Sequence, residues 1–301
     1  MDALEPNAER FSGFADLYDT CRPAPPDDLA RLLVGYAGGR VGHAVDLGCG
    51  TGLSTRWLAG LAGRVTGVEP SADMRAVAAA AGGGAISYQE GWSHASGLDD
   101  ACADLVVAVQ ALHWMEPTST LAEVARILRP GGIFAAIDCD WPPMVGHAGV
   151  EAAWDTCRRR MRVLEERVAS GWEDAAVAEA PVRDDDPLAE GYDGSDAHRD
   201  RSLIGGVRSW SKSGHLDRMI ASGHFEWCRD VVTHTTEPGD ADRFVGLMRS
   251  QGDYQTLRRR GFDDDLIGLT ELATVTRAGL GDGEVPFRFG YRSRIGMMPR
   301  G

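Results

Sequence analysis

The feature that most constrains this chain is a glycine-rich turn between a predicted strand and a predicted helix. An apolar stretch carries Asp46 near its end, runs into Gly48, Gly50 and Gly52, and is followed by a helical stretch. Glycines at alternate positions remove Cβ atoms, so a ligand can lie directly against the backbone of such a turn. The sequence predicts a ligand-binding turn here, the alternative being a tight turn that binds nothing.

The spacing of these glycines does not fit the dinucleotide-binding pattern G-x-G-x-x-G. That pattern would need glycine where the chain has Leu53 or Thr55, so a pyrophosphate site is disfavoured. The next predicted strand ends in Glu69, 19 residues after Gly50. An acid at roughly 20 residues reaches a ribose diol, which suits any adenosine ligand.

Strand and helix patterns alternate through the first half of the chain. Strands are predicted at 41–47, 64–69, 85–89, 103–109 and 132–138, and helices at 53–61, 71–81 and 117–128. Continuously apolar strands are expected where helices cover both faces of a sheet. This alternation predicts an α/β fold with a doubly wound parallel sheet.

On these residues the chain resembles the class I S-adenosylmethionine (SAM) methyltransferases. The resemblance rests on the glycine loop, the acid-ended strand, the strand-four segment 104–114 and the segment 123–132 before strand five. It implies a seven-stranded Rossmann-like sheet, with 288–296 as its antiparallel seventh strand, and SAM as cofactor. It implies these cofactor-binding residues: Tyr18, Asp46, Gly48, Gly50, Gly52, Glu69, Pro70, Met74, Trp92, Ser93, Gln110 and Trp114.

The resemblance also implies what these residues contact. The glycine loop would pass under the methionine part of SAM, and Glu69 would bond both ribose hydroxyls. Members of the family usually follow strand three with Gly-Asp-Ala-Glu, whose acid bonds the adenine amine. Here Trp92 takes that place and cannot accept a hydrogen bond. We expect Trp92 to stack on adenine, with Ser93 and main-chain groups reading the ring edge.

The first 36 residues form a predicted helical lid. Phe11, Phe14 and Tyr18 share one helical face by their spacing. Packing on the core is one interpretation, and it is favoured for Phe14. The other comes from the resemblance, because small-molecule methyltransferases often begin with a segment that closes over SAM. Tyr18 would then approach the methionine end of the cofactor, and Phe11 would contact the methyl acceptor.

The chain divides into four predicted parts. After the lid come a SAM-binding core over 37–140 and a helical cap over 141–226, which holds helices at 150–169 and 210–222 and an acidic loop at 181–201. The last part, 227–301, holds strands at 227–233 and 288–296 around a second helical insertion at 240–280. Ligands bind beyond the carboxyl ends of the strands in open α/β sheets, so these insertions are expected to enclose a small acceptor.

His113 and Tyr18 are the candidate catalytic residues. His113 follows strand four, and histidine side chains have pKa values near neutrality, which suits a general base. The alternative is that His113 has a structural role and orders its loop. Trp114 could contact the sulfonium through its ring or simply pack. Asp140 and Trp141 follow strand five, where acceptor-binding residues often lie in this family. Asp140 could hold an acceptor amine or order its loop. Surface positions are favoured for His215, His224 and His234.

The composition limits the kinds of binding partner and the cellular compartment that we expect for this protein. The net charge of −14 argues against nucleic acid and anionic membrane, which are bound largely by Lys and Arg. No apolar run approaches the roughly 18 residues of a membrane span, and the start of the chain lacks the features of a signal peptide. The six cysteines show no C-x-x-C spacing, so a metal ribbon is disfavoured and a cytoplasmic location is expected.

The sequence thus predicts a methyltransferase acting on N or O of a small molecule, with a homo-oligomer left open. Only one of its 31 basic residues, Lys212, is lysine, which suggests a high-GC source and natural-product chemistry. Within the family the chain looks closest to actinobacterial antibiotic methyltransferases, including the lincosamide N-methyltransferase type. The alternatives are carboxyl O-methylation of a small organic acid and a non-catalytic SAM-binding regulator or scaffold.

Overall fold

A computed structural model describes residues 6–7, 13, 15–179, 182 and 200–301. The predictions for Phe11 and Phe14, and nearly all of the loop predicted at 181–201, lie outside the described residues. Within that part of the chain, no helix is both long enough and apolar enough to cross a membrane.

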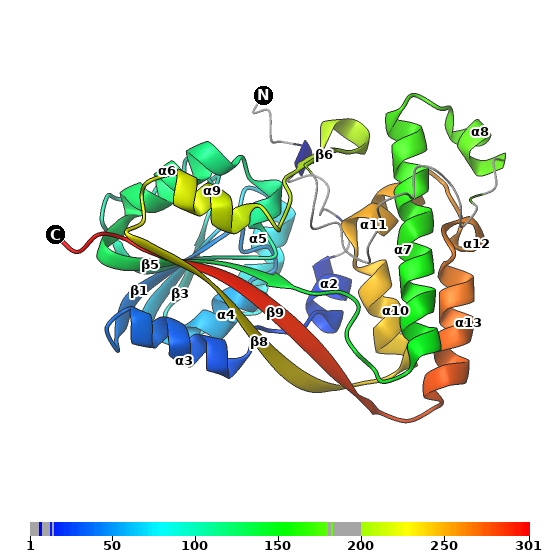
Figure 1. Cartoon of the computed structure of the whole chain (residues 1–301), viewed down its shortest axis with the longest axis horizontal. Helices are drawn as coiled ribbons and strands as arrows, with labels where there is room; N and C mark the ends of the chain where they lie inside the picture. Colours follow the sequence, from blue (N-terminus) through cyan, green and yellow to red (C-terminus); the bar gives the residue numbers. More distant parts are fainter. Residues whose placement is uncertain (1–5, 8–12, 14, 180–181, 183–199) are drawn as a thin grey trace.

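The molecule is built on a seven-stranded sheet with the order β3-β2-β1-β4-β5-β9-β8 (Figure 1). The strands are β1 Val41–Leu47, β2 Ala62–Val68, β3 Ile86–Gln89, β4 Ala103–Val109, β5 Leu128–Cys139, β8 Trp227–Gly239 and β9 Val285–Met297. Strands β1 to β5 pair in parallel, and β9 is antiparallel to both of its neighbours. The predicted doubly wound Rossmann-like sheet is confirmed, with β9 lying between β5 and β8.

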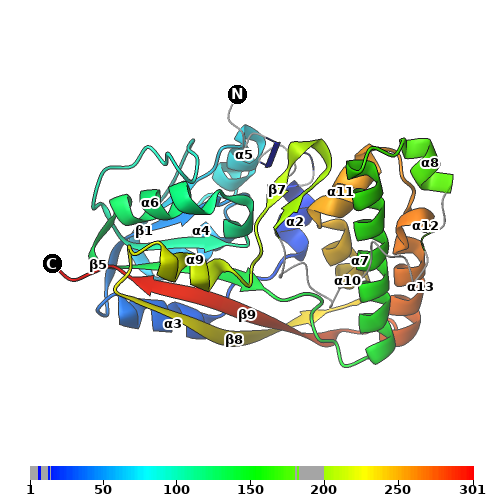
Figure 2. The same ribbon diagram turned by 45° about the horizontal axis from the view of Figure 1, so that its top comes forward.

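Helices cover both faces of this sheet, as the continuously apolar strands require. Figures 1 and 2 show α3 (Asp27–Tyr36) on one side, and α6 (Pro117–Ile127) and α9 (His215–Ala221) on the other. Along β4, Leu105 and Val107 belong to one core cluster and Val106 to the other, and all three are fully buried. Two further helices, α4 (Leu53–Ala59) and α5 (Ala72–Ala80), follow β1 and β2.

A helical lobe stands beside the sheet at the end of a long β-ribbon (Figure 2). The ribbon pairs β8 with β9 from Trp227↔Met297 to Gly239↔Val285, whereas β5 accompanies β9 only from Met297 to Tyr291. The lobe contains α7 Ala148–Ala169, α8 Asp174–Glu179, α10 Ala241–Arg249, α11 Gly252–Arg259, α12 Asp264–Ile267 and α13 Leu269–Leu280. Helices α7 and α8 of the predicted cap therefore pack with the second insertion in one lobe, whereas α9, which falls within the predicted cap, lies on the sheet.

Several predicted boundaries differ from the structure. The helix predicted at 210–222 is only α9, because Trp210 N donates to His113 O (2.8 Å) and Arg208–Ser209 forms β7, which pairs with β6 (Arg201–Ser202). The strand predicted at 132–138 begins at Leu128, and the strand predicted at 227–233 continues to Gly239. The edge strand is lengthened by pairing with β9, which a local pattern does not reveal.

An aromatic cluster joins the helical lobe to the ribbon. Trp154 of α7 is fully buried and its ring lies 5.2 Å from Phe244 and 6.2 Å from Trp141, measured between ring centroids. We expect Trp154→Ala to lower the free energy of unfolding by about 3–5 kcal/mol, because it leaves a large cavity. Val232→Ala on β8, where the side chain is exposed, should change it by less than about 0.5 kcal/mol. Urea unfolding followed by circular dichroism would measure both, and equal effects would contradict this assignment of the core.

Candidate active site

A cavity that is partly open to solvent lies at the carboxyl ends of the parallel strands. Its walls come from the segments that follow β1, β2, β3, β4 and β5, from Tyr291 on β9, and from the N-terminal segment. Most of the predicted cofactor residues line it: Tyr18, Gly48, Gly50, Glu69, Pro70, Met74, Trp92, Ser93, Gln110 and Trp114. Parallel strands place all these loop ends at one edge of the sheet, which is where ligands bind in open α/β folds.

The glycine loop forms the floor of the cavity. All three predicted glycines have positive φ, at +68° for Gly48, +53° for Gly50 and +80° for Gly52. A Cβ atom at Gly48 would lie 2.7 Å from Met115 Cε, and one at Gly52 would collide with Tyr88. A Cβ atom at Gly50 would meet no described atom within 4 Å, and Gly50 lines the cavity. The loop therefore presents bare backbone to a ligand at Gly50.

Asp46 lies beneath this loop and does not line the cavity. Its Oδ2 accepts hydrogen bonds from Ser54 Oγ and Thr55 Oγ1, both at 2.7 Å, so it ties the end of β1 to the first turn of α4. Complete burial raises the pKa of Asp46 to about 6 despite these bonds. In the structure Asp46 shapes the loop, and its predicted contact with the cofactor remains a prediction, as does that of Gly52.

Glu69 lines the cavity and is joined directly to the glycine loop. Its Oε2 accepts from Gly50 N (3.0 Å) and its Oε1 from Ser71 N (2.9 Å). Burial raises the pKa of Glu69, and the two amide hydrogen bonds oppose that shift. The acid and the loop, which the sequence links only by spacing, therefore form one structural unit.

Trp92 and Ser93 reach the cavity on the segment after β3. Trp92 and Ala95 exchange two backbone hydrogen bonds, at 3.1 and 3.0 Å, which fix a tight turn. Thr120 Oγ1 donates to Ser93 Oγ at 2.9 Å. This placement is compatible with the predicted adenine contacts, which remain a prediction.

The N-terminal segment closes the cavity with residues that the sequence did not single out. Asn7 Nδ2 donates to Trp114 O (2.6 Å) and to Arg208 O (2.8 Å), and its Oδ1 accepts from Arg208 N. The guanidinium carbon of Arg22 lies 4.7 Å from the centroid of the Tyr18 ring and 4.6 Å from that of Trp141. Arg22 and Pro23 fall within the predicted lid, but no pattern in the sequence indicated a role for Arg22 or for Asn7.

Comparison with known proteins identifies the domain in which this cavity lies. Residues 45–136 match a family model described as a methyltransferase domain. An uncharacterised methyltransferase of Mycobacterium bovis is 36% identical over 122 residues, which cover 40% of this chain and 49% of that protein. A malonyl-[acyl-carrier protein] O-methyltransferase of Pectobacterium atrosepticum is 32% identical over 127 residues, which cover 42% and 49%.

A third relative is a ubiquinone/menaquinone biosynthesis C-methyltransferase of Rubrivivax gelatinosus. It is 33% identical over 138 residues, which cover 44% of this chain and 55% of that protein. The chain thus spans about half the length of the curated relatives it matches. A solved structure from Anaeromyxobacter dehalogenans, named as a candidate type II methyltransferase, shares the fold over 93% of this chain and 99% of its own, with a TM-score of 0.60 and 24% identity.

This chain carries a class I SAM-dependent methyltransferase domain. Its cofactor is SAM, and the residues present fit it, because the bare backbone at Gly50 opens into the cavity beside the carboxylate of Glu69. The predicted family and cofactor are confirmed.

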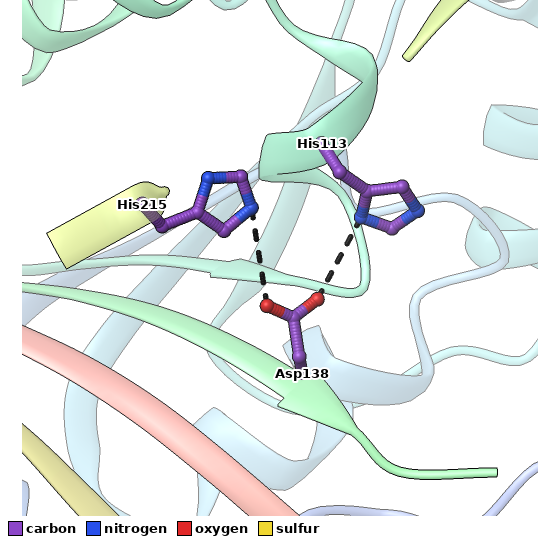
Figure 3. A group of neighbouring side chains, drawn as sticks. All are labelled: His113, Asp138 and His215. Atoms are coloured by element: carbon purple, nitrogen blue, oxygen red, sulfur yellow. Dashed lines mark ion pairs between the residues drawn. The ribbon is translucent and has the colours of Figure 1, made fainter. Parts of the chain in front are cut away.

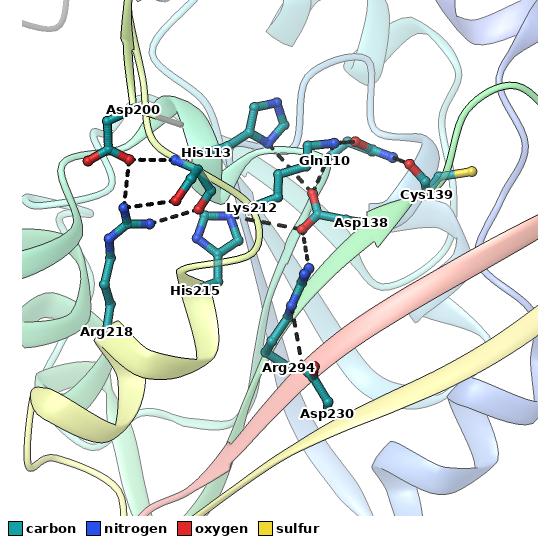
Figure 4. Close-up of polar contacts among 11 residues, drawn as sticks. Gln110, His113, Asp138, Cys139, Asp200, Lys212, His215, Arg218, Asp230 and Arg294 are labelled. Carbon is teal, nitrogen blue, oxygen red and sulfur yellow. Dashed lines mark hydrogen bonds and ion pairs between the residues drawn. The ribbon is translucent and has the colours of Figure 1, made fainter. Parts of the chain in front are cut away.

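Behind the cavity of the methyltransferase domain lies a buried carboxylate with several cationic and imidazole neighbours. Arg294 Nη1 donates to Asp138 Oδ2 at 2.6 Å, and Lys212 Nζ lies 3.3 Å from Oδ1 (Figure 4). His113 Nδ1 lies 3.6 Å from Oδ1, and His215 Nε2 lies 3.9 Å from Oδ2 (Figure 3). Burial alone would raise the pKa of Asp138, but Lys212 and the two histidines outweigh it and hold the pKa below its ordinary value.

His113 is part of this cluster and does not line the cavity. Its carbonyl oxygen accepts from Trp210 N, and its ring centroid lies 4.7 Å from that of Trp114. Burial lowers the pKa of His113 to about 4, with a further contribution from Lys212. The geometry therefore favours the loop-ordering interpretation over general base catalysis, which remains an untested alternative.

His215 was expected at the surface, and this expectation is wrong. It is 1% exposed because α9 packs its first turn against the end of β5. Its Nε2 and the Nδ1 of His113 have no hydrogen-bond partner in the described structure, although both are buried. The donor atoms of His113, Asp138 and His215 all lie within 4.8 Å of one another. Such spacing could suit a metal ion, but Lys212 and Arg294 already compensate the only carboxylate.

Gln110 connects this cluster to the cavity. Its Oε1 accepts from Lys212 Nζ (2.8 Å), and its Nε2 donates to Cys139 O (3.0 Å). Its φ of +53° is unusual for a residue with a side chain and directs the chain around the end of β4.

Of the predicted acceptor residues, Trp141 lines the cavity and Asp140 does not, since Asp140 N bonds Gly290 O on β9.

We expect Glu69→Gln to weaken SAM binding by about tenfold or more, or about 1.4 kcal/mol, because it removes the charge from the ribose end of the cavity. Glu90→Gln is the matched control, since Glu90 follows the neighbouring strand, has a 74% exposed side chain and forms an ion pair with Arg75. Isothermal titration calorimetry would measure both affinities. Unchanged affinity in Glu69→Gln would refute a ribose contact.

The buried histidines should make stability fall in acid. Burial lowers the pKa of His215 to about 3, so between about pH 6.5 and that value the unfolded chain binds a proton that the native protein does not. Stability contributed by His215 is therefore lost as the pH falls below 6.5. His215→Gln should reduce the loss between pH 7 and 5.5 by about 1 kcal/mol, measured by urea unfolding. His234→Gln at an exposed position should not change it.

Proposed function

We propose that this chain transfers the methyl group of SAM to a nitrogen or oxygen atom of a small molecule, in natural-product biosynthesis. The observation that carries the proposal is the cavity itself. It continues from the glycine loop and Glu69 to an aromatic wall formed by Tyr18, Trp141 and Tyr291. This aromatic wall extends the cavity beyond the glycine loop and Glu69, which supports an acceptor site over a purely regulatory SAM-binding module.

The chain's residues have a limited chemical task. SAM, when bound, supplies a methyl group on a sulfonium that is already a good leaving group. The protein must hold the acceptor atom in line with that methyl group and exclude water, and such positioning can supply up to roughly 7–11 kcal/mol. The rings of Tyr18 and Trp114 line the cavity and could stabilise the positive sulfonium through their faces.

The two insertions support the site indirectly. From the predicted cap and the second insertion, Trp141 is the one described residue that lines the cavity. Ser250 instead accepts from Arg22 Nε through Oγ (2.9 Å) and from Nη2 through its carbonyl (3.0 Å). The helical lobe thereby holds the N-terminal segment over the cavity. An acceptor small enough to fit beneath this segment suits the arrangement better than a polymer.

We also propose that the protein binds neither nucleic acid nor membranes and that it works in the cytoplasm. This proposal rests on the net charge of −14 and on the absence of extended apolar runs in the sequence. The natural-product role rests on the composition and on the weak antibiotic-methyltransferase resemblance. Of the relatives compared above, one is named for carbon methylation and one for oxygen methylation, so they do not fix the acceptor atom.

Calorimetric titration with SAM, followed by a radiolabelled methyl-transfer screen against amines, phenols and carboxylic acids, would test this function. We expect micromolar or tighter SAM binding, with transfer to one acceptor class. Absence of SAM binding would refute the proposal at the glycine loop. Binding with no transfer to any class would favour the regulator.

A further inference from the structure

The segment after β3 reads the purine ring of the cofactor. We propose that adenine stacks on Trp92 and bonds the hydroxyl group of Ser93, and that its exocyclic amine is not required for binding. The inference rests on the proposed methyltransferase function and on the predicted ribose contact of Glu69. It adds a specificity to that site, because a keto purine should be accepted in place of adenine.

The order of the strands places the adenine. In the sheet order β3-β2-β1, the glycine loop follows β1, Glu69 follows β2 and Trp92 follows β3. Methionine and adenine are attached to opposite ends of the ribose. With the methionine part over the glycine loop and the ribose at Glu69, the adenine extends toward the segment after β3. Trp92 and Ser93 line the cavity there.

The acids near this end of the cavity are committed elsewhere. Glu69 is the one acid among the described residues that line the cavity, and the ribose is predicted to bind it. Glu90, just before this segment, has a 74% exposed side chain and forms an ion pair with Arg75. Glu123 of α6 accepts from Ser96 N at 2.8 Å and is not among the lining residues. The amine of adenine, a hydrogen-bond donor, therefore has no carboxylate acceptor among these residues.

The hydroxyl group of Ser93 can act as a donor or as an acceptor. Thr120 Oγ1 of α6, which is fully buried, donates to Ser93 Oγ at 2.9 Å. This bond leaves the proton of Ser93 and one lone pair of its oxygen for a ligand. The proton can be donated to N1 of adenine or to O6 of hypoxanthine, whereas a carboxylate can only accept and would repel O6. Ser93 thus suits both an amino purine and a keto purine.

The turn that carries Trp92 is fixed before any ligand binds. Trp92 and Ala95 exchange backbone hydrogen bonds, and the ring centroids of Trp92 and His94 lie 6.2 Å apart. The bond from Ser96 N to Glu123 attaches the end of this turn to α6. An indole ring on a fixed turn loses little freedom when a base stacks on it. Stacking is tolerant of the identity of the base, because every base has a π-face.

The first test compares two ligands that differ only at the purine edge. S-adenosylhomocysteine carries the amine, and S-inosylhomocysteine carries a keto oxygen in its place. We expect the wild-type chain to bind the two with dissociation constants within about threefold of each other, by isothermal titration calorimetry. A preference of about tenfold or more for S-adenosylhomocysteine would overturn this inference and leave the proposed function intact. Binding of neither ligand would refute both.

Substitution of Trp92 should create the missing discrimination. Trp92→Asp places a carboxylate at the purine edge, so it should prefer S-adenosylhomocysteine by about tenfold or more. Trp92→Asn is the matched control, because it removes the same ring without adding a charge. It should bind both ligands about tenfold more weakly than the wild type and still within about threefold of each other. Equal binding of the two ligands by Trp92→Asp, or wild-type affinity in Trp92→Asn, would contradict the assignment of Trp92.

Ser93→Ala tests the hydroxyl group separately. It should weaken the binding of both ligands by a similar factor, about threefold to tenfold. Ser87→Ala is the control, since Ser87 is exposed on β3 and does not line the cavity, and it should change neither affinity. A loss confined to S-adenosylhomocysteine would mean that Ser93 reads the amine and would overturn the inference, as would unchanged affinities. Methyl transfer from SAM by the wild type tests the proposed function independently of all these variants.

Discussion

The architecture of this protein depends on neutralising one buried carboxylate at the end of β5. Asp138 is 4% exposed, and a charge in such a place costs several kcal/mol unless partners surround it. Those partners come from the loop after β4, from the segment that leads into α9, and from β9, the strand nearest the C-terminus. Three regions far apart in the sequence therefore meet at the point where the sheet ends and the cavity begins.

A second set of contacts links the helical lobe to the N-terminal segment. Arg243 of α10 donates from Nε to Cys21 O (3.3 Å), and a Cβ atom at Gly246 would lie 2.6 Å from the Cys21 sulfur. The lobe therefore packs too closely against α2 (Ala15–Cys21) to admit any side chain there. The loops at the edge of the sheet form the site. The N-terminal segment covers it, and the helical lobe holds that segment in place without lining the cavity.

The sequence was sufficient where function depends on local pattern and insufficient where it depends on tertiary contacts. The glycine loop, Glu69 and the apolar strands predicted the fold, because each is a local pattern, and the family resemblance that these residues carry implied the cofactor and most of the cavity-lining residues. The burial of His215 could not be predicted, since its partner Asp138 lies on another strand. The same holds for Asn7 and Arg22, whose positions depend on residues about 200 positions away. The Trp210–Ser222 helix was too long for a similar reason, because a backbone bond to His113 holds its first residues out of the helix.

Lys212 gives the molecule a property that its other cations do not share. It is the one lysine in the sequence, and its amine lies between Gln110 of the cavity wall and the carboxylate of Asp138. The remaining basic side chains are guanidiniums, which stay charged at any pH the protein survives. Lysine-directed acylation would therefore convert this one side-chain cation into a neutral amide without modifying any guanidinium, and its rate would report how accessible the Lys212 amine is beside Asp138.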